Sequence, residues 1–338
     1  MLLRPLAALA RTAPRCARRY STDRPLVTLT RLSDSPLAAA SRQAVSPAPG
    51  APDARAAAYE PELDGGISLL TLDRAPARNA ISMQLLAELE ECVEAARGDG
   101  TRVLVIRSLV PSTFCAGADL RERKGMTPAQ VDTFLLALRR TLSSIERLPF
   151  PCLAALDGTA LGGGLELALC ADVRIAGPGA RLGLTETRLG IIPGAGGTHR
   201  LTRLVGPARA KDLIFSARIL DGQTAHALGV VEHYAPAYNG GEGGDEALMA
   251  AVASARQMAG NGPLALKAAK LAIDRGEGMD TCVMCLPFCG QHRLTSDFCS
   301  ETALDWERAC YDRLMGTQDR LEGLRAFAEK RRPRYTGE

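Results

Sequence analysis

Short apolar runs alternate with longer amphipathic stretches through the first two thirds of the chain. The apolar runs are too short for helices and suit strands, and the fully apolar ones suit strands buried in a parallel sheet. Between them, apolar residues recur at helical spacing. The pattern predicts strands at 67–72, 103–106, 152–156 and 173–176, and helices at 83–96 and 131–147, the first capped by Asn79.

This alternation predicts an α/β fold whose strands are joined by crossover helices. From Pro207 onward the pattern becomes mainly helical. We therefore expect a β/α core at 59–260 and a C-terminal helical region at 261–338. The preceding stretch, 23–58, is rich in Ala, Pro and Ser, which predicts a disordered linker.

The first 22 residues have a composition unlike that of the rest. They contain no acidic side chain, and they contain Arg4, Arg11, Arg15, Arg18 and Arg19 together with several leucines. An arginine-rich, acid-poor amphipathic start is typical of a mitochondrial transit peptide, whereas a secretory signal has a longer apolar centre. We predict a transit peptide at 1–22 and a location in the mitochondrial matrix, with a disordered basic tail as the alternative.

Composition excludes several classes of protein. Of the 338 residues, 46% are hydrophobic and 23% charged, as in soluble globular enzymes. The formal net charge of +3 gives no sign of a nucleic-acid partner, and no apolar run is long enough to span a bilayer. The ten cysteines are scattered or crowded late in the chain, so they do not predict a disulfide framework.

Candidate chemistry lies in two glycine-rich stretches, each with a glutamate. Gly162, Gly163 and Gly164 begin a predicted apolar helix, whose first N–H groups are unpaired donors suited to developing negative charge. Glu166 lies one turn into this helix, where a carboxylate is unfavourable unless it is paired or used. Glu186 precedes a second glycine-rich loop. The two form a candidate acid/base pair, although each alone suits a surface or salt-bridged residue.

Three motifs occur together in a specific order. They are Phe-Cys-Ala-Gly-Ala-Asp-Leu at 114–120, Ala-Leu-Gly-Gly-Gly-Leu-Glu-Leu-Ala at 160–168 and Gly-Leu-Thr-Glu-Thr-Arg-Leu-Gly-Ile-Ile-Pro-Gly-Ala-Gly-Gly-Thr at 183–198. With these motifs the chain resembles the enoyl-CoA hydratase (crotonase) family from about Glu60 to Glu338. The resemblance implies the crotonase (ClpP-like) spiral of repeated ββα units. It also implies addition of water across the 2,3-double bond of a short or branched enoyl-CoA.

The resemblance also implies residue roles. The backbone N–H groups of Ala116 and Gly163 are expected to form an oxyanion hole around the thioester oxygen. Glu166 is expected to act as base on the water, and Glu186 to supply the α-proton. The residues expected to bind CoA are Ala118, Asp119, Phe327 and Lys330.

The family needs no cofactor, because coenzyme A is part of its substrate, and it needs no metal. Its members form trimers and hexamers, so the resemblance implies a homo-trimer or homo-hexamer. We expect no membrane or nucleic-acid partner, because the net charge is small and no apolar run could span a bilayer. One alternative is an isomerase, or a hydratase of plain short-chain enoyl-CoA. A second alternative is RNA binding, which some members are described to perform through a lysine-rich first helix. Here the matching helix, 82–94, contains acidic side chains and no lysine. Acidic side chains repel phosphates, so the sequence argues against RNA binding.

Residues 282–300 do not resemble the family. They contain Cys282, Cys285, Cys289, His292 and Cys299, in a spacing that only loosely suggests zinc ligands. A zinc site, an inserted surface loop and a translated intron all stay open, and we favour the intron. Sequencing the transcript tests the intron, because a spliced message would join Thr281 to Glu301. If the message retains the segment, a metal bound to the purified protein would support the zinc site.

Overall fold

The computed structural model describes residues 24–38, 61–237, 244–279 and 296–338. They fall into two compact units. The first holds the described residues up to Leu148 and from Cys152 to Arg256, and the second holds Pro149–Pro151 and Gln257–Glu338. The predicted transit peptide at 1–22 lies outside the described residues.

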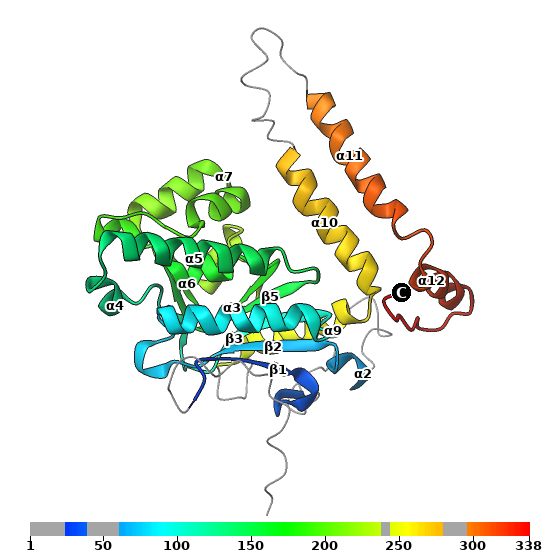
Figure 1. The fold of residues 1–338 in the computed structure, drawn as a ribbon, viewed down its shortest axis with the longest axis horizontal. Coiled ribbons are helices and arrows are strands. Elements are labelled where there is room, and N and C mark those ends of the chain that lie inside the picture. The colour runs from blue at the N-terminus through cyan, green and yellow to red at the C-terminus, as the bar shows by residue number, and fades with distance from the viewer. Residues whose placement is uncertain (1–23, 39–60, 238–243, 280–295) are drawn as a thin grey trace, which may run out of the picture. The chain divides into compact units, whose positions relative to one another are not determined.

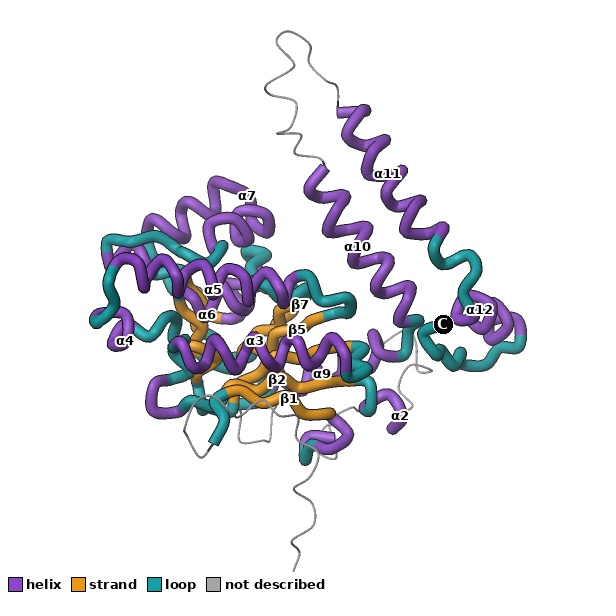
Figure 2. The backbone as a smooth tube through the Cα atoms, in the orientation of Figure 1, coloured by secondary structure: helices purple, strands orange, loops and turns teal. Residues whose placement is uncertain are grey.

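Two sheets form the centre of the first unit (Figure 2). The larger has the order β1 (Val27–Arg31), β2 (Ile67–Leu72), β3 (Val103–Ser108), β5 (Cys152–Leu156), β7 (Val173–Ala176) and β10 (His233–Tyr234). The smaller has the order β4 (Thr113–Cys115), β6 (Thr159–Leu161), β8 (Arg181–Gly183) and β9 (Leu220–Asp221). Neighbouring strands are parallel except at β1 and β9, each of which pairs antiparallel at an edge.

The chain alternates between these sheets in a repeating unit. β3 is followed by β4, β5 by β6 and β7 by β8, so each pair places one strand in each sheet before a helical segment follows. These segments are α4 (Leu120–Lys124), α5 (Pro128–Glu146), α6 (Gly163–Ala168), the 3₁₀ helix η3 (Glu186–Leu189) and α7 (Gly197–Ser216). The predicted α/β spiral of ββα units is confirmed.

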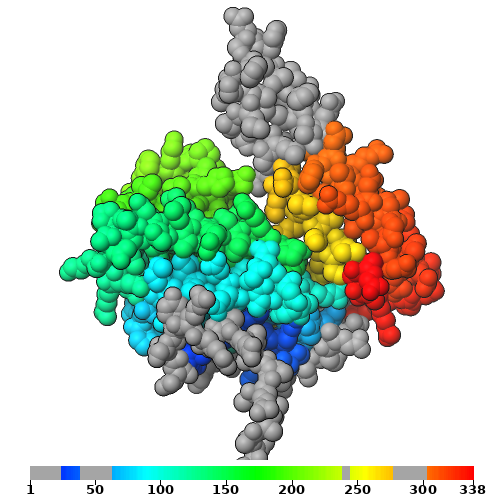
Figure 3. Space-filling view, viewed as in Figure 1, coloured from blue at the N-terminus to red at the C-terminus, as the bar shows by residue number. Residues whose placement is uncertain are grey.

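The apolar runs lie where their pattern predicts. Every residue of β2 and β5 is buried, as expected for parallel strands covered on both faces. The predicted helices at 83–96 and 131–147 are α3 (Met83–Gly98) and α5, which pack against each other in the first unit (Figure 3). The predicted cap was wrong. Ser82 caps α3 by accepting a hydrogen bond from the N–H of Leu85 at 3.2 Å.

The linker predicted at 23–58 is wrong for its first part. Residues 27–31 form β1, which pairs with β2 in register from Val27 opposite Leu72. A buried carboxylate on α3 holds this strand, because Glu88 accepts hydrogen bonds from the N–H groups of Leu26 and Val27 at 2.6 and 3.0 Å. The 3₁₀ helix η1 (Leu32–Asp34) follows. Folded structure therefore begins well before residue 59, and residues 39–58 lie outside the described part.

The remaining elements of the first unit are short. They are α2 (Pro61–Asp64), the 3₁₀ helix η2 (Ala75–Ala77), α8 (Gly222–Ala227) and most of α9 (Glu246–Ala259). Arg256 of α9 makes a two-pronged ion pair with the buried carboxylate of Asp64, at 2.7 and 3.0 Å. This pair joins α9 to α2, although the two residues are 192 positions apart in the sequence.

The second unit is helical. It contains α10 (Pro263–Met279), α11 (Ser296–Asp312) and α12 (Gln318–Ala328), and α10 packs along α11 (Figure 1). The indole N–H of Trp306 donates to the carbonyl of Leu271 at 3.3 Å, which joins these two helices. The C-terminal residues fold back on α12, where the carboxylate of Asp319 accepts hydrogen bonds from the N–H groups of Thr336 and Gly337.

Most of the atypical segment 282–300 lies outside the described residues, and residues 296–300 form the start of α11. The three open interpretations of this segment therefore stay open. Within the described ranges, no helix has the length and apolar character needed to cross a membrane. The same ranges contain no cluster of three or more His, Cys, Asp or Glu side chains arranged to hold a metal ion.

Candidate active site

Three parallel strands of the smaller sheet bring the sequence motifs together. β4, β6 and β8 are neighbours, so their carboxyl ends meet at one edge of the sheet. The turn 116–119 follows β4, the start of α6 follows β6, and η3 follows β8 after two residues. A pocket of about 620 Å³ opens at this edge. Its lining includes Ala116, Ala118, Gly163, Glu166 and Glu186.

Glu166 is buried, with 2% of its surface exposed. Its Oε1 atom accepts hydrogen bonds from the N–H groups of Ala195 and Gly197, both at 2.8 Å. Burial raises the pKa of this carboxyl, against the two N–H bonds and the charges of Arg200 and Arg139, which lower it. The carboxylate is thus anchored through one oxygen at the edge of the pocket.

Arg200 supports the loop that anchors Glu166. It lies in the first turn of α7, is 8% exposed, and donates to the carbonyl of Ala195 at 2.8 Å. It also pairs with Glu146 of α5 at 2.8 Å. Arg200 therefore holds the carbonyl of Ala195, while the N–H of Ala195 donates to Glu166. The sequence offered no signal for this role.

Glu186 has a different environment. It begins η3 and is half-buried, and its Oε2 atom has no hydrogen-bond partner among the described residues. Burial raises its pKa to about 7, and the neighbouring charge of Glu166 contributes in the same direction. Two carboxyl groups in one pocket with unlike surroundings are suited to one base and one acid.

The hydrogen bonds around the pocket bear on which N–H groups are available for the expected oxyanion hole. The N–H of Ala116 donates to the carbonyl of Arg78 at 3.0 Å, so it is already used within the fold. In the described part of the chain, no recorded hydrogen bond uses the N–H of Ala118 or of Gly163. A Cβ placed on Gly163 would lie 3.5 Å from the nitrogen of Ala118, so these two peptides are neighbours. Ala118, predicted only as a CoA contact, replaces Ala116 as the candidate donor beside Gly163.

The glycines at this edge permit close backbone contact. Gly162 has a φ of +51°, and a Cβ there would lie 3.1 Å from Glu186 Oε1. A Cβ on Gly164 would lie 2.1 Å from the carbonyl oxygen of Cys115. α6 therefore packs directly on the end of β4, which places its first N–H groups beside the turn at 117–118.

We expect Gly164→Ala to destabilise the protein by about 1–3 kcal/mol or more, because α6 must move away from β4 to admit the methyl group. Gly98→Ala is a matched control. Gly98 is the last residue of α3, and a Cβ there meets nothing within 4 Å. The control should be neutral or stabilising by up to about 1 kcal/mol. Denaturant unfolding of the two variants checks this, and equal stability would contradict the close packing.

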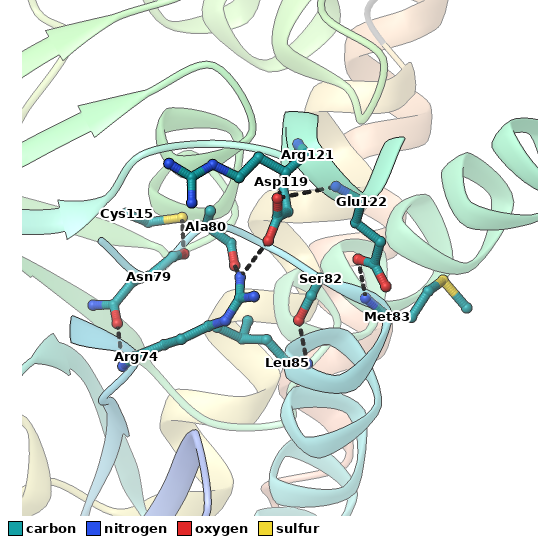
Figure 4. Close-up of polar contacts among 10 residues, drawn as sticks. All are labelled: Arg74, Asn79, Ala80, Ser82, Met83, Leu85, Cys115, Asp119, Arg121 and Glu122. Carbon is teal, nitrogen blue, oxygen red and sulfur yellow. Dashed lines mark hydrogen bonds and ion pairs between the residues drawn. The ribbon is translucent and has the colours of Figure 1, made fainter. Parts of the chain in front are cut away.

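A polar network fixes the turn 116–119 from its far side (Figure 4). Asp119 caps α4 by accepting from the N–H groups of Arg121 and Glu122, and it pairs with Arg74 at 2.7 Å. Arg74 also donates to the carbonyl of Ala80 at 2.7 Å. The side chain of Asp119 is thus engaged in holding the turn and does not line the pocket. Its contact with CoA stays a prediction.

Asn79, whose backbone has a φ of +54°, joins the loop before α3 to β3 and β4. Its side chain accepts from the N–H of Arg74 at 2.7 Å and donates to Ser108 Oγ and the carbonyl of Phe114. Cys115 donates its thiol to the carbonyl of Asn79, and burial raises the pKa of that thiol to about 12. This cysteine is therefore a structural group rather than a nucleophile.

The last two predicted CoA contacts lie in the second unit. The side chain of Phe327, on α12, is 86% exposed, and Lys330 follows the helix with a φ of +54°. The two units are separate bodies, so the contact of these residues with CoA stays a prediction.

Comparisons with known proteins agree with this geometry. The profile of the enoyl-CoA hydratase/isomerase family matches residues 62–282, ending where the atypical segment begins. Mouse methylglutaconyl-CoA hydratase, mitochondrial, is 46% identical over 278 residues, which is 82% of each chain. Human enoyl-CoA hydratase domain-containing protein 2, mitochondrial, is 44% identical over 275 residues, covering 81% of this chain and 87% of that one. A crystal structure of enoyl-CoA hydratase from Bacillus anthracis superposes with a TM-score of 0.71 at 40% identity, covering 81% and 96%.

The fold and the paired carboxylates therefore define a crotonase-type enzyme, and the chain belongs to the enoyl-CoA hydratase/isomerase family. It is a hydro-lyase that acts as an enoyl-CoA hydratase.

Proposed function

We propose that the chain hydrates 3-methylglutaconyl-CoA, with Glu166 and Glu186 as the acid/base pair and the N–H groups of Ala118 and Gly163 as the oxyanion hole. The observation that carries the hydration step is the pair of carboxyl groups with unlike environments in one pocket, beside two backbone N–H groups for which no hydrogen bond is recorded among the described residues. The donors stabilise the negative charge that develops on the thioester oxygen.

Glu166 is the base in this mechanism. It takes a proton from the bound water as the water oxygen bonds to C3 of the acyl group, and the double-bond electrons move toward the thioester carbonyl. Glu186, with a pKa of about 7, is largely protonated at slightly acidic pH and gives its proton to C2. One water is consumed, its hydroxyl ends on C3, and the pair of glutamates exchanges protonation states. The step requires no cofactor.

The substrate is supported by relatives rather than by pocket geometry. Relatives named methylglutaconyl-CoA hydratase in mouse, rat and human are 45–46% identical over 278 residues. Assaying purified protein with 3-methylglutaconyl-CoA and crotonyl-CoA, by the loss of conjugated-thioester absorbance, tests the proposal. We expect a higher kcat/KM for 3-methylglutaconyl-CoA. Faster hydration of crotonyl-CoA would replace the proposal with a short-chain enoyl-CoA hydratase.

The raised pKa of Glu186 predicts a pH dependence. An acid must be protonated to donate, so hydration should slow as the pH rises through about 7, where Glu186 loses its proton. At low pH the rate should fall as Glu166, the base, becomes protonated. A bell-shaped profile of kcat/KM for hydration is expected, and Glu186→Gln should lack the alkaline limb near 7. A profile flat from pH 6 to 9 would contradict the assignment of Glu186 as the acid.

We also propose that the protein works in the mitochondrial matrix as a homo-trimer or homo-hexamer. The acid-free start at 1–22 and the mitochondrial names of the relatives support the location. A fluorescent reporter fused after residue 22 should be imported, and the same fusion lacking 1–22 should stay in the cytosol. Cytosolic signal from the intact fusion would contradict the location. Light scattering of the purified protein measures the subunit number.

A further inference from the structure

Two arginines line the pocket that holds Glu166 and Glu186. Arg123 comes from α4 and Arg139 from α5. The helical side of the pocket around them is otherwise apolar, with Leu120, Val131, Phe134, Leu135 and Leu138 in the lining. The hydration step uses carboxyl groups and backbone N–H groups, so it assigns no role to either cation. A charged group beside apolar side chains is favourable only when it meets an opposite charge or water.

Arg139 already has a task within the fold. Its Nε donates to the carbonyl of Gly194 at 2.5 Å, in the loop whose next peptides hold Glu166. Its charge also lowers the pKa of Glu166, against the larger effect of burial. Arg139 therefore supports the loop that anchors Glu166, and its positive charge stabilises the Glu166 carboxylate.

Arg123 has no such task. Its guanidinium lies over the ring of Phe134, with 5.9 Å between the central carbon and the ring centroid. Phe134 is fully buried, so its ring is a fixed surface beneath the guanidinium. Arg123 is half-buried and, within the described residues, has no recorded ion pair or side-chain hydrogen bond. A guanidinium that lies over an aromatic face can still present its N–H groups to a planar anion.

We propose that Arg123 binds a carboxylate at the distal end of the acyl group, so that the pocket selects enoyl-CoA thioesters of dicarboxylic acids. The inference rests on the proposed function, since it concerns the acyl end of the same substrate. Arginine binds carboxylates through two parallel N–H bonds, which gives both energy and orientation. A neutral acyl end would leave the cation facing an apolar group, so the same residue also disfavours that substrate.

The test compares two substrates that differ by one carboxylate, glutaconyl-CoA and crotonyl-CoA. The measured quantity is the ratio of their kcat/KM values in the wild type, Arg123→Met, Arg123→Lys and Arg121→Met. Arg121 is a matched control, because it lies on the same helix, is exposed and does not line the pocket. Its replacement removes the same charge two residues away.

We expect Arg123→Met to lower the ratio by about 10- to 100-fold, as for loss of a charged hydrogen-bonded pair. Arg123→Lys should keep part of the preference, and Arg121→Met should leave the ratio within about twofold because exposed charges are screened. Thermal unfolding of each variant verifies that the fold persists.

Two outcomes would overturn the proposal. An equal loss on both substrates in Arg123→Met would show that the side chain only packs on Phe134. An equal drop of the ratio in Arg121→Met would show that general charge, rather than Arg123, sets the preference. Failure of the wild type to hydrate 3-methylglutaconyl-CoA as well as these two substrates contradicts the proposed function instead. A wild type that hydrates both, with an unchanged ratio in Arg123→Met, overturns the role of Arg123 alone.

Discussion

Replacing Glu166 by Gln is expected to lower kcat for hydration by at least about 100-fold, and replacing Glu186 by Gln should have an effect of similar size. Each change keeps the shape of the side chain and removes its ability to exchange a proton. Glu166→Gln leaves a side-chain oxygen that can still accept from the N–H groups of Ala195 and Gly197, so the loop should stay in place. The loss would then report on chemistry rather than on folding.

The measurement is steady-state hydration followed by the absorbance of the conjugated thioester, together with the Kd of a CoA ester that cannot react. Binding should survive in both variants, since neither removes a group assigned to CoA. Glu94→Gln is the control, because Glu94 has an exposed side chain on α3 outside the pocket. Near-normal turnover in either variant would show that its glutamate is not the base or acid proposed here.

The strands were predictable because burial on both faces leaves a plain signal. The run 67–72 is apolar enough to predict a central strand, and β2 has those bounds. β1 was not predictable in the same way. Its five residues, Val27–Arg31, lie in a segment whose composition is typical of a linker. Their fold depends on a buried carboxylate, Glu88, about 60 positions away, which no local pattern reveals.

The candidate site likewise has residues that the sequence identifies and others whose role depends on tertiary contacts. Both glutamates and Gly163 were identified from motifs, and the structure places them in one pocket. The choice between Ala116 and Ala118 as the second oxyanion donor could not be made from the sequence, because the motif places an alanine on each side of Gly117. In the structure the N–H of Ala116 donates to the carbonyl of Arg78, whereas no bond from the N–H of Ala118 is recorded among the described residues. That difference depends on how the loop before α3 crosses the end of β4, which is a tertiary feature.

The sequence also could not predict the roles of Arg123, which lines the pocket, and of Arg200, which supports the loop beside it. Helical periodicity marks Phe134 and Leu138 as one apolar face of α5, and both are buried. Arg123 belongs to a separate five-residue helix, α4, and joins that face only through tertiary packing. Arg200 is a surface-type residue by its sequence context, yet it is buried against the loop that holds Glu166.

Gly163→Pro tests the oxyanion hole most directly, because proline has no N–H to donate. Gly163 is the first residue of α6, a position where proline is well tolerated since its N–H has no intrahelical partner. A Cβ there meets Ala118 N at 3.5 Å and Ile81 Cδ1 at 3.6 Å, which are ordinary contacts. We expect kcat to fall by about 10²- to 10³-fold, as for loss of one oxyanion-hole donor. Gly163→Ala adds a Cβ and keeps the donor, so it should retain more activity.

A structure with a bound acyl-CoA then identifies the partner donor. The thioester oxygen should lie about 3 Å from the nitrogens of both Gly163 and Ala118, the distance at which such donors act. If the oxygen instead met the nitrogen of Ala116, the bond from Ala116 to Arg78 would have to break on binding, and the assignment of Ala118 would be wrong. If Gly163→Pro and Gly163→Ala lost equal activity, the added carbon rather than the missing N–H would be the cause. Gly163→Ala therefore controls for the added Cβ, and the bound structure shows which N–H groups reach the thioester oxygen.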